Sequence, residues 1–121
     1  MDIRVKRAYR AARRSDGARI LVDRLWPRGF SKERFRLDHW AKELAPSTAL
    51  RHWYNHDPAR WEDFKIRYAK ELDGQTEAVK ALLAAAHEGP VTLLYAAKDE
   101  TLNNAVALKA YLENHAMRKN Q

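Results

Sequence analysis

The chain has 121 residues, 45% of them hydrophobic, which is enough to bury the core of one domain without disulfide bonds. It contains no cysteine, and this excludes disulfides, thiolate catalysis and zinc sites built from thiolates. The formal net charge of +7 favours anionic partners, such as phosphorylated ligands or nucleic acids, without identifying one.

Two strands are predicted in the first quarter of the chain. Apolar and charged residues alternate over 3–7, which is typical of a short, half-exposed strand. Asp16 and Gly17 then form a turn signal, and the apolar stretch 19–22 predicts a second, more buried strand. The segment 23–29 follows directly, and its proline and glycine exclude a regular element.

Two short helices are predicted next. Asp38 is expected to cap a helix over 39–44, which the following proline ends. Ser47 is expected to cap a second helix over 48–54.

Two longer helices follow. Asp57 and Pro58 form a helix start signal, and the apolar residues after them repeat at helical spacing as far as Gly74. The alanine-rich stretch 77–87 has one apolar face and predicts another helix.

The last part of the chain predicts a buried strand and a helix. The stretch 91–95 is short and apolar, as expected of a central strand, and Asp99 or Thr101 is expected to start the last helix. Long helical connections between strands imply a parallel pair covered by helices. The predicted fold is therefore α/β, one domain over residues 1–121, with a short mixed or parallel sheet of about three strands and four to five helices.

A candidate ligand site follows from this arrangement. If strands 19–22 and 91–95 are parallel, the segments after them meet at one edge of the sheet, where open α/β sheets place ligands. We expect this edge to bind a small molecule with a phosphate or carboxylate group, since guanidinium groups match two oxygens of such a group. The residues expected to bind it are Arg24, Arg28, Gly29, Arg51, Lys98 and Asn103.

Two carboxylates are candidate catalytic residues at the same edge. Asp23 or Asp99 would orient the cations or act as a general base if its surroundings raise its pKa. The alternative is that Asp23 pairs with Arg24, Arg28 or Arg51 and pins the loop beneath Trp26. The chain would then be a structural or interaction module with a buried salt-bridge network. We expect Trp26 to belong to the core.

Other polar residues favour structural roles. Asn103 and Asn104 are expected to cap the neighbouring turn, although either could bind a ligand. Arg67 and Glu71 lie four residues apart, and we favour an ion pair within one helix over a pair facing a cleft.

No metal and no cofactor are predicted. His52 and His56 are four residues apart, but the second lies in a predicted turn and no HExxH pattern accompanies them. The glycine-rich loops that bind nucleotides and the GxSxG nucleophile motif do not occur.

Nucleic-acid binding is the second candidate function. The basic residues between Arg10 and Arg14 would supply charge, and tryptophan and tyrosine would supply rings for stacking. No apolar run is long enough to span a membrane and the first residues lack the pattern of a signal peptide, so we expect a cytoplasmic protein that does not bind membranes. The sequence does not indicate an oligomeric state.

A long motif covers the second predicted strand and the loop after it, with the sequence Gly17-x-Arg19-x-Leu21-Val22-Asp23-Arg24-Leu25-Trp26-Pro27-Arg28-Gly29. Further motif residues are Trp40, Leu44-Ala45-Pro46-Ser47, Leu50-Arg51, His56-Asp57-Pro58, Trp61, Phe64, Arg67-Tyr68, Glu71-Leu72, 91–95 and Asn103-x-Ala105. In these residues, over almost its whole length, the chain resembles the YeaO-like bacterial proteins, within domain of unknown function family 488. The resemblance implies one cytosolic domain and no catalytic residue, because that family is named for having no assigned function.

Overall fold

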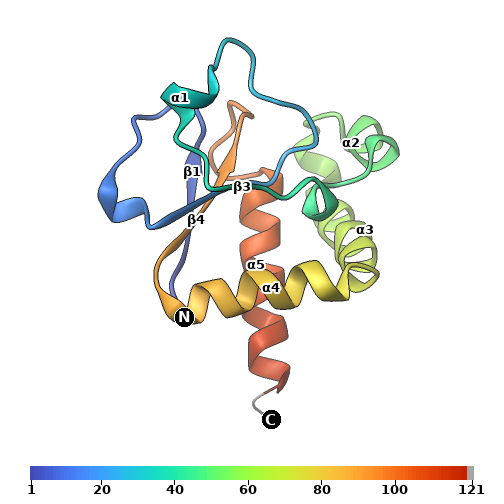
Figure 1. Cartoon of the computed structure of the whole chain (residues 1–121). Helices are drawn as coiled ribbons and strands as arrows, with labels where there is room; N and C mark the ends of the chain where they lie inside the picture. The colour runs from blue at the N-terminus through green and yellow to red at the C-terminus, as the bar shows by residue number, and fades with distance from the viewer. Residues whose placement is uncertain (120–121) are drawn as a thin grey trace.

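The computed structural model describes the backbone of residues 1–119 and the side chains of residues 1–116. Its sheet has four strands in the order β1-β4-β2-β3, and every neighbouring pair is parallel (Figure 1). The strands are β1 (Ile3–Arg7), β2 (Ala18–Leu21), β3 (His39–Trp40) and β4 (Val91–Tyr95). The predicted α/β fold and the parallel pairing of β2 with β4 are confirmed, with one strand more than expected.

Five α-helices and three short 3-10 helices complete the structure. The α-helices are α1 (Lys32–Phe35), α2 (Thr48–Tyr54), α3 (Trp61–Asp73), α4 (Thr76–Glu88) and α5 (Asn104–Lys119). The 3-10 helices are η1 (Arg14–Asp16), η2 (Lys42–Leu44) and η3 (Pro58–Arg60). Two of the predicted caps are confirmed, because Ser47 Oγ accepts the N–H of Leu50 at 3.1 Å and Asp57 Oδ1 accepts that of Ala59 at 3.0 Å.

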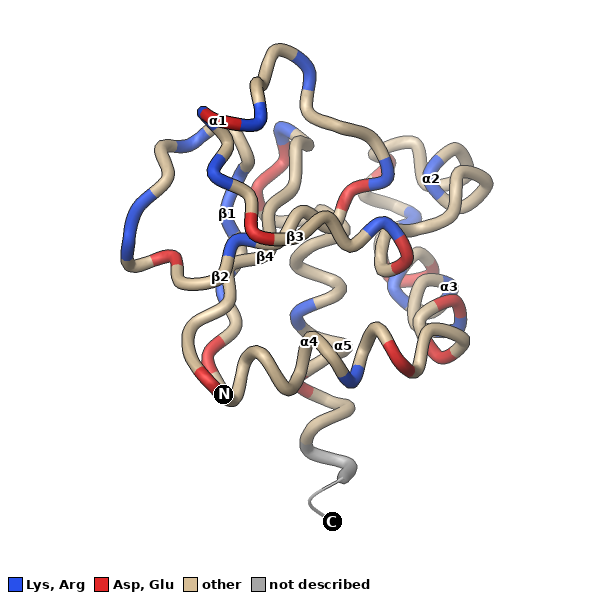
Figure 2. The backbone as a smooth tube through the Cα atoms, viewed as in Figure 1, with Lys and Arg blue, Asp and Glu red and all other residues tan. Residues whose placement is uncertain are grey.

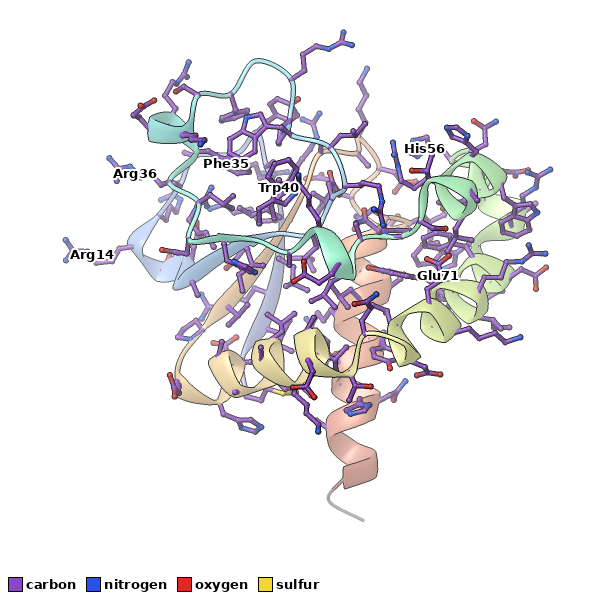
Figure 3. The ribbon with its side chains drawn as sticks, turned by 45° about the vertical axis from the view of Figure 1, so that its right-hand side comes forward. Arg14, Phe35, Arg36, Trp40, His56 and Glu71 are labelled. Atoms are coloured by element: carbon purple, nitrogen blue, oxygen red, sulfur yellow. The ribbon has the colours of Figure 1, made fainter. Side chains whose placement is uncertain are left out.

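The sheet has an apolar core on each face. Alternate residues of a strand point to opposite faces, so Leu93 packs with helices α2 to α5 in the larger core, whereas Leu94 faces the smaller one. In the smaller core Leu21 and Leu94 pack against Phe35, with the rings of Trp26 and Trp40 beside it (Figure 3). Trp26 is therefore a partly buried residue packed against the smaller core, and its indole N–H donates to the carbonyl of Phe30 at 2.7 Å.

The helix predicted over 39–44 forms only at its end, as the 3-10 helix η2, and the prediction is wrong for His39 and Trp40. The side chain of Asp38, which was expected to cap it, accepts the backbone N–H of Arg19 at 2.7 Å instead. His39 and Trp40 form strand β3, and the N–H of Ala41 donates to the carbonyl of Leu21 at 2.8 Å. The pairing of this segment with β2 therefore replaces the local helix.

Helix α5 begins later than predicted. Asp99 and Thr101 lie in the turn before it, and the helix starts at Asn104. Asn103 provides the cap, because its side-chain Oδ1 accepts the N–H of Val106 at 2.9 Å. The capping role expected of the asparagines is confirmed for Asn103.

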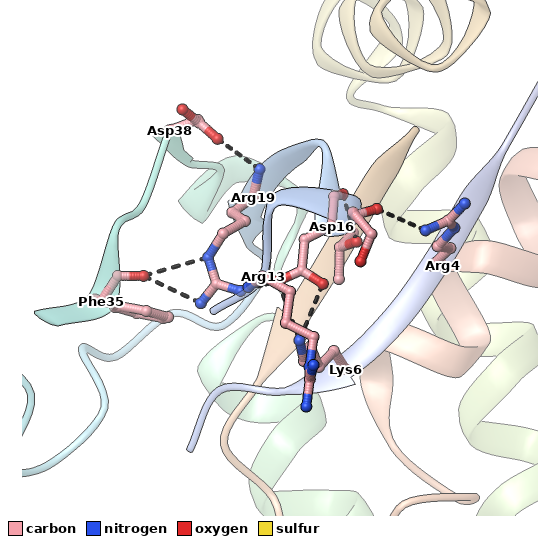
Figure 4. A network of polar contacts seen from close by, with 9 residues as sticks. Arg4, Lys6, Arg13, Asp16, Arg19, Phe35 and Asp38 are labelled. Carbon is pink, nitrogen blue, oxygen red and sulfur yellow. Dashed lines mark hydrogen bonds and ion pairs between the residues drawn. The ribbon is translucent and has the colours of Figure 1, made fainter. Parts of the chain in front are cut away.

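A buried ion cluster joins β1, β2 and the 3-10 helix η1 between them in the sequence (Figure 4). Asp16 pairs with Lys6 at 2.9 Å and with Arg19, whose guanidinium also donates to the carbonyl of Phe35. Burial opposes the charge of Asp16, but hydrogen bonds from the Arg13 N–H and from the two cations outweigh it and lower the pKa of this carboxyl. A buried salt-bridge network therefore exists, at a different place from the arginine loop after β2.

Candidate functional site

A cavity of about 560 Å³ opens where strands β2 and β4 end. The loop after β2, helix α2, the segment after β4 and the start of α5 form its walls. Its polar and aromatic lining includes Asp23, Arg24, Trp26, Arg28, Arg51, His52, Tyr54, His56, Phe64, Asn103 and Asn104. Ligand pockets of open parallel sheets lie at this end of the strands, and this volume suits a small molecule.

Asp23 is the only carboxylate among the described residues that line this cavity. Its Oδ2 accepts the backbone N–H of Ala96 at 2.8 Å, and its Oδ1 accepts the side-chain amide of Asn104 at 3.1 Å. Burial raises the pKa of Asp23, and the two hydrogen bonds and the charge of Arg51 offset only part of this effect. Asp23 is thus a half-buried carboxyl whose position is fixed by two hydrogen bonds. Its charged form is less favoured than that of an exposed aspartate.

Three guanidinium groups line the cavity together with Asp23, and none of them pairs with a carboxylate of the described residues. Arg24 donates through Nε to the carbonyl of Pro46 at 3.2 Å, which fixes its stem against the start of α2. In the part of the chain that the structure describes, Arg28 and Arg51 form no ion pair, and both are exposed at the cavity. The pairing of Asp23 with an arginine, expected as an alternative, is therefore not formed among the described residues.

Lys98 lies beside this cavity rather than in its lining. It lines a neighbouring hollow of about 350 Å³ together with Arg7, Tyr9, Arg10 and Glu100. Tyr9 lines both hollows and forms the boundary between them. The structure thus brings Lys98 to the same end of the sheet as the arginines, with Tyr9 between its hollow and their cavity.

Asp99 and Asn103 are occupied by the turn that precedes α5. The Oδ1 atom of Asp99 accepts the N–H groups of Thr101 and Leu102 at 2.9 Å and 3.0 Å, and these bonds lower the pKa of Asp99. Asn103 is buried, and its amide donates to the carbonyl of Asp99 at 3.0 Å. Asp99 is exposed and absent from the cavity lining, so the structure does not bring it together with Asp23.

Gly29 shapes the loop without lining the cavity. Its φ of 84° is in the left-handed region that favours glycine, and a Cβ at this position would meet no atom within 4 Å. The residue therefore allows the chain to turn back after Arg28, and this turn sets where the guanidinium of Arg28 can reach.

Several lining residues were not predicted as part of the site. Asn104 donates its amide to the carbonyl of Val22 at 2.9 Å as well as to Asp23, and it fixes the position of that carboxylate. Tyr54 donates its hydroxyl to the carbonyl of Leu102 at 3.0 Å, which joins α2 to the turn before α5. No sequence spacing signals such contacts between distant segments.

The two histidines that were considered as metal ligands also line the cavity. His56, with a φ of 53°, lies in the turn after α2 (Figure 3) and lines the cavity. Among the described residues no group of three or more histidine, cysteine, aspartate or glutamate side chains could hold a metal ion. Tyr54 and Phe64 stack with ring centroids 4.4 Å apart, so the floor beneath the histidines is aromatic.

The ion pair expected between Arg67 and Glu71 does not form, and this prediction is wrong. Glu71 points toward the start of α2 (Figure 3), where its carboxylate accepts the N–H of Ser47 at 2.9 Å and the hydroxyl at 2.6 Å. Arg67 lies instead over the ring of Trp53, 3.9 Å from its centroid. Both side chains thus join α2 to α3.

Comparison with known proteins places the chain in a family. The sequence model described as "Inactive DUF488-N3 subclade" matches residues 2–121. The chain belongs to this family. The resemblance noted from the long motif is confirmed.

Relatives of this DUF488 chain cover different shares of its length. The "Uncharacterized protein YeaO" of Escherichia coli (strain K12) is 44% identical over 114 residues, which are 94% of this chain and 99% of that protein. The "Uncharacterized protein Rv3073c" of Mycobacterium tuberculosis (strain ATCC 25618 / H37Rv) is 47% identical over 70 residues, 58% of this chain and 59% of that protein. No solved structure matches the chain significantly. Among the described residues, no helix has the length and apolar character needed to cross a membrane.

Proposed function

We propose that this DUF488 chain binds a small molecule with a phosphate or carboxylate group in the cavity at the ends of β2 and β4. The observation that supports this most is the charge of the lining, where Arg24, Arg28 and Arg51 meet a single carboxylate, Asp23. Unpaired guanidinium groups around a hollow favour an anion that can accept two hydrogen bonds from each fork.

Each arginine has a distinct part in this proposal. Arg28 and Arg51 have their guanidinium groups free of internal carboxylates among the described residues, so they bind the anion directly. Arg24 is anchored through Nε to Pro46 and presents its remaining N–H groups. Leu25 lines the cavity and is 62% exposed, so it gives the apolar part of the ligand a surface to pack on. Lys98, beside the cavity, adds to the positive potential that attracts the anion.

We propose binding without turnover. Asp23 is the group best placed to act as a general base, because burial raises its pKa toward neutral pH. The matching family, however, is described as an inactive subclade, and Asp99 is not among the residues that line the cavity. In this proposal Asp23 therefore orients the ligand or the arginines. The proposal also places the function in the cytoplasm, which suits a chain without cysteine.

A thermal-shift panel of phosphorylated sugars and of di- and tricarboxylates tests this proposal. A ligand at about 100 times its dissociation constant stabilises the folded state by about 2.7 kcal/mol, which raises the melting temperature by several degrees. We expect at least one compound to do so with the wild type, and the shift to be lost in Arg28→Ala and in Arg51→Ala.

The matched control is Lys70→Ala, which removes one positive charge from an exposed position on α3. It should keep the full shift. A panel without any stabilising compound, or a shift of equal size in Arg28→Ala, would overturn the proposal.

A further inference from the structure

The positive charge of the chain is concentrated in one segment. Residues 10–36 contain nine arginines or lysines and three aspartates or glutamates, a net charge of +6 out of the +7 of the whole chain. Arg19 and Asp16 in this segment neutralise each other in the buried cluster, so the excess lies almost entirely at the surface.

Two parts of this segment lie side by side in the fold. The ring of Tyr9 packs against that of Phe30 with centroids 5.0 Å apart, and the Tyr9 hydroxyl donates to the carbonyl of Arg28 at 3.1 Å. The loop that leads into η1 and the segment around α1 therefore form one surface, and lysines and arginines run along both (Figure 2). Arg14 and Arg36, one from each part, project outward on the same side of the molecule (Figure 3).

We define the basic face as five exposed side chains of these two parts, namely Arg13, Arg14, Lys32, Arg34 and Arg36. Within the described part of the chain, none of the five is in an ion pair. Four of the five are arginines, whose planar fork matches phosphate oxygens better than the ammonium group of lysine. The exposed ring of Tyr9, 40% accessible, lies next to the basic face.

We propose that the basic face binds single-stranded nucleic acid, with the arginines on the phosphates and the exposed part of the Tyr9 ring, which Phe30 and Arg7 hold in place, in contact with a base. Cationic surfaces with adjacent aromatic rings bind single strands in this way. The five cations of the basic face lie outside the small-molecule site, because none of them lines that cavity; Tyr9 is the residue that the two sites share.

The shape of the basic face favours a single strand over other polyanions. Base readout in the major groove of a duplex uses a helix or a two-stranded ribbon, and α1 has only four residues. Binding to an anionic membrane is favoured by a helix with an apolar side, and this face is formed by loops and by that short helix. The rings beside it, those of Trp26, Phe30 and Phe35, pack into the smaller core.

Fluorescence anisotropy with a labelled oligouridylate of about 20 nucleotides tests the proposal, since single-strand sites span up to about 16 nucleotides. If each of the five residues neutralises one phosphate, the logarithm of the binding constant falls with the logarithm of salt concentration with a slope of about −3.5. The double variant Arg14→Gln and Arg34→Gln, one residue from each part, should flatten this slope by about 1.4 and weaken binding on the order of tenfold.

The double variant Lys70→Gln and Lys80→Gln is the matched control. It removes the same charge from exposed positions on α3 and α4, and α4 lies at the opposite end of the molecule from α1 (Figure 1). The control should bind as the wild type does. A second pair, Arg13→Gln with Lys32→Gln, should reproduce the loss seen with the first.

Three results would overturn the proposal. These are the absence of oligonucleotide binding at low salt, an equal loss in the control variant, and tighter binding to duplex DNA or to vesicles rich in phosphatidylserine. The small-molecule proposal is tested separately, because Arg28→Ala should remove the thermal shift while Arg14→Gln with Arg34→Gln should leave it intact.

Discussion

The side-chain amide of Asn104 donates a hydrogen bond of 3.1 Å to the carboxylate of Asp23. Asn104 is the first residue of α5, and Asp23 lies in the loop just after β2. This bond therefore joins two segments more than 80 positions apart in the sequence. The same amide also donates to the carbonyl of Val22 at 2.9 Å. One side chain thus fixes the carboxylate of the candidate site and the backbone beside it.

Replacing Asn104 with alanine should raise the pKa of Asp23 further. The amide hydrogen bond favours the charged carboxylate, and its loss leaves burial less opposed. The change should also destabilise the fold by about 1–3 kcal/mol, because the carbonyl of Val22 loses a partner. NMR titration of the Asp23 carboxyl carbon measures the pKa, and a lower value in the variant would contradict the role given to Asn104.

The raised pKa of Asp23 makes its contribution to stability dependent on pH. The unfolded chain releases this proton near the ordinary aspartate pKa of 3.8, whereas the folded chain holds it to a higher pH. Between the two values the unfolded state binds fewer protons, so stability falls as pH rises. The free energy of unfolding of the wild type, compared with that of Asp23→Asn, should therefore decrease as pH rises from below 3.8 through the folded pKa. Above the folded pKa this difference should become constant. Urea unfolding of both proteins across this range checks the prediction, and a difference that grows in favour of the wild type would refute it.

Replacing Asp16 with asparagine should be strongly destabilising. The change strands Arg19, which is 4% exposed, and removes a partner of Lys6, at an expected cost of about 3–5 kcal/mol. Because the pKa of Asp16 is lowered in the folded state, its contribution to stability should be present above the unfolded pKa and lost as pH falls through the folded pKa.

Glu62→Gln, which breaks the exposed pair with Lys65, is the control in urea unfolding and should cost about 0–1 kcal/mol. Similar losses in the two variants would show that the cluster is not a structural network.

Two glycines with positive φ should respond differently to alanine. At Gly17, with a φ of 66°, a Cβ would lie 2.1 Å from the carbonyl oxygen of Pro90, so a clash adds to the strain of the left-handed backbone. At Gly29 the backbone strain alone applies, at about 1–2 kcal/mol. Thermal or urea unfolding should show Gly17→Ala as clearly the less stable variant. Equal losses would mean that the turn before β2 can move away from Pro90.

The sequence predicted those parts of the fold that depend on local pattern and on connection length. The apolar run 91–95 and the long helical connection before it were sufficient to predict a central strand parallel to β2. The cap at Ser47 was predicted because it rests on residues three positions apart. Strand β3 was missed because two residues show no periodicity, and because the contact that decides it, between Asp38 and Arg19, joins segments distant in sequence.

The sequence was sufficient to predict which segments meet at the candidate site, but not which side chains line it. Parallel pairing brings the segments after β2 and β4 together, as expected, but the turn after β4 decides which side chains enter the cavity. There Asp99 binds the N–H groups of its own turn, and Asn104 reaches Asp23 instead. The pairing of Glu71 with Ser47 was likewise unpredictable, because helical spacing favours a local partner and cannot reveal one on another helix.

The most direct test of the anion site is an NMR titration of the nitrogen-15-labelled protein with inorganic phosphate at constant ionic strength. We expect saturable shifts of the Nε–H signals of Arg28 and Arg51 and of the backbone amides of Ala97 and Asn104, and the loss of these shifts in Arg28→Ala. Shifts that do not saturate, or that occur only at the basic face, would contradict the proposal that the cavity between β2 and β4 binds anions.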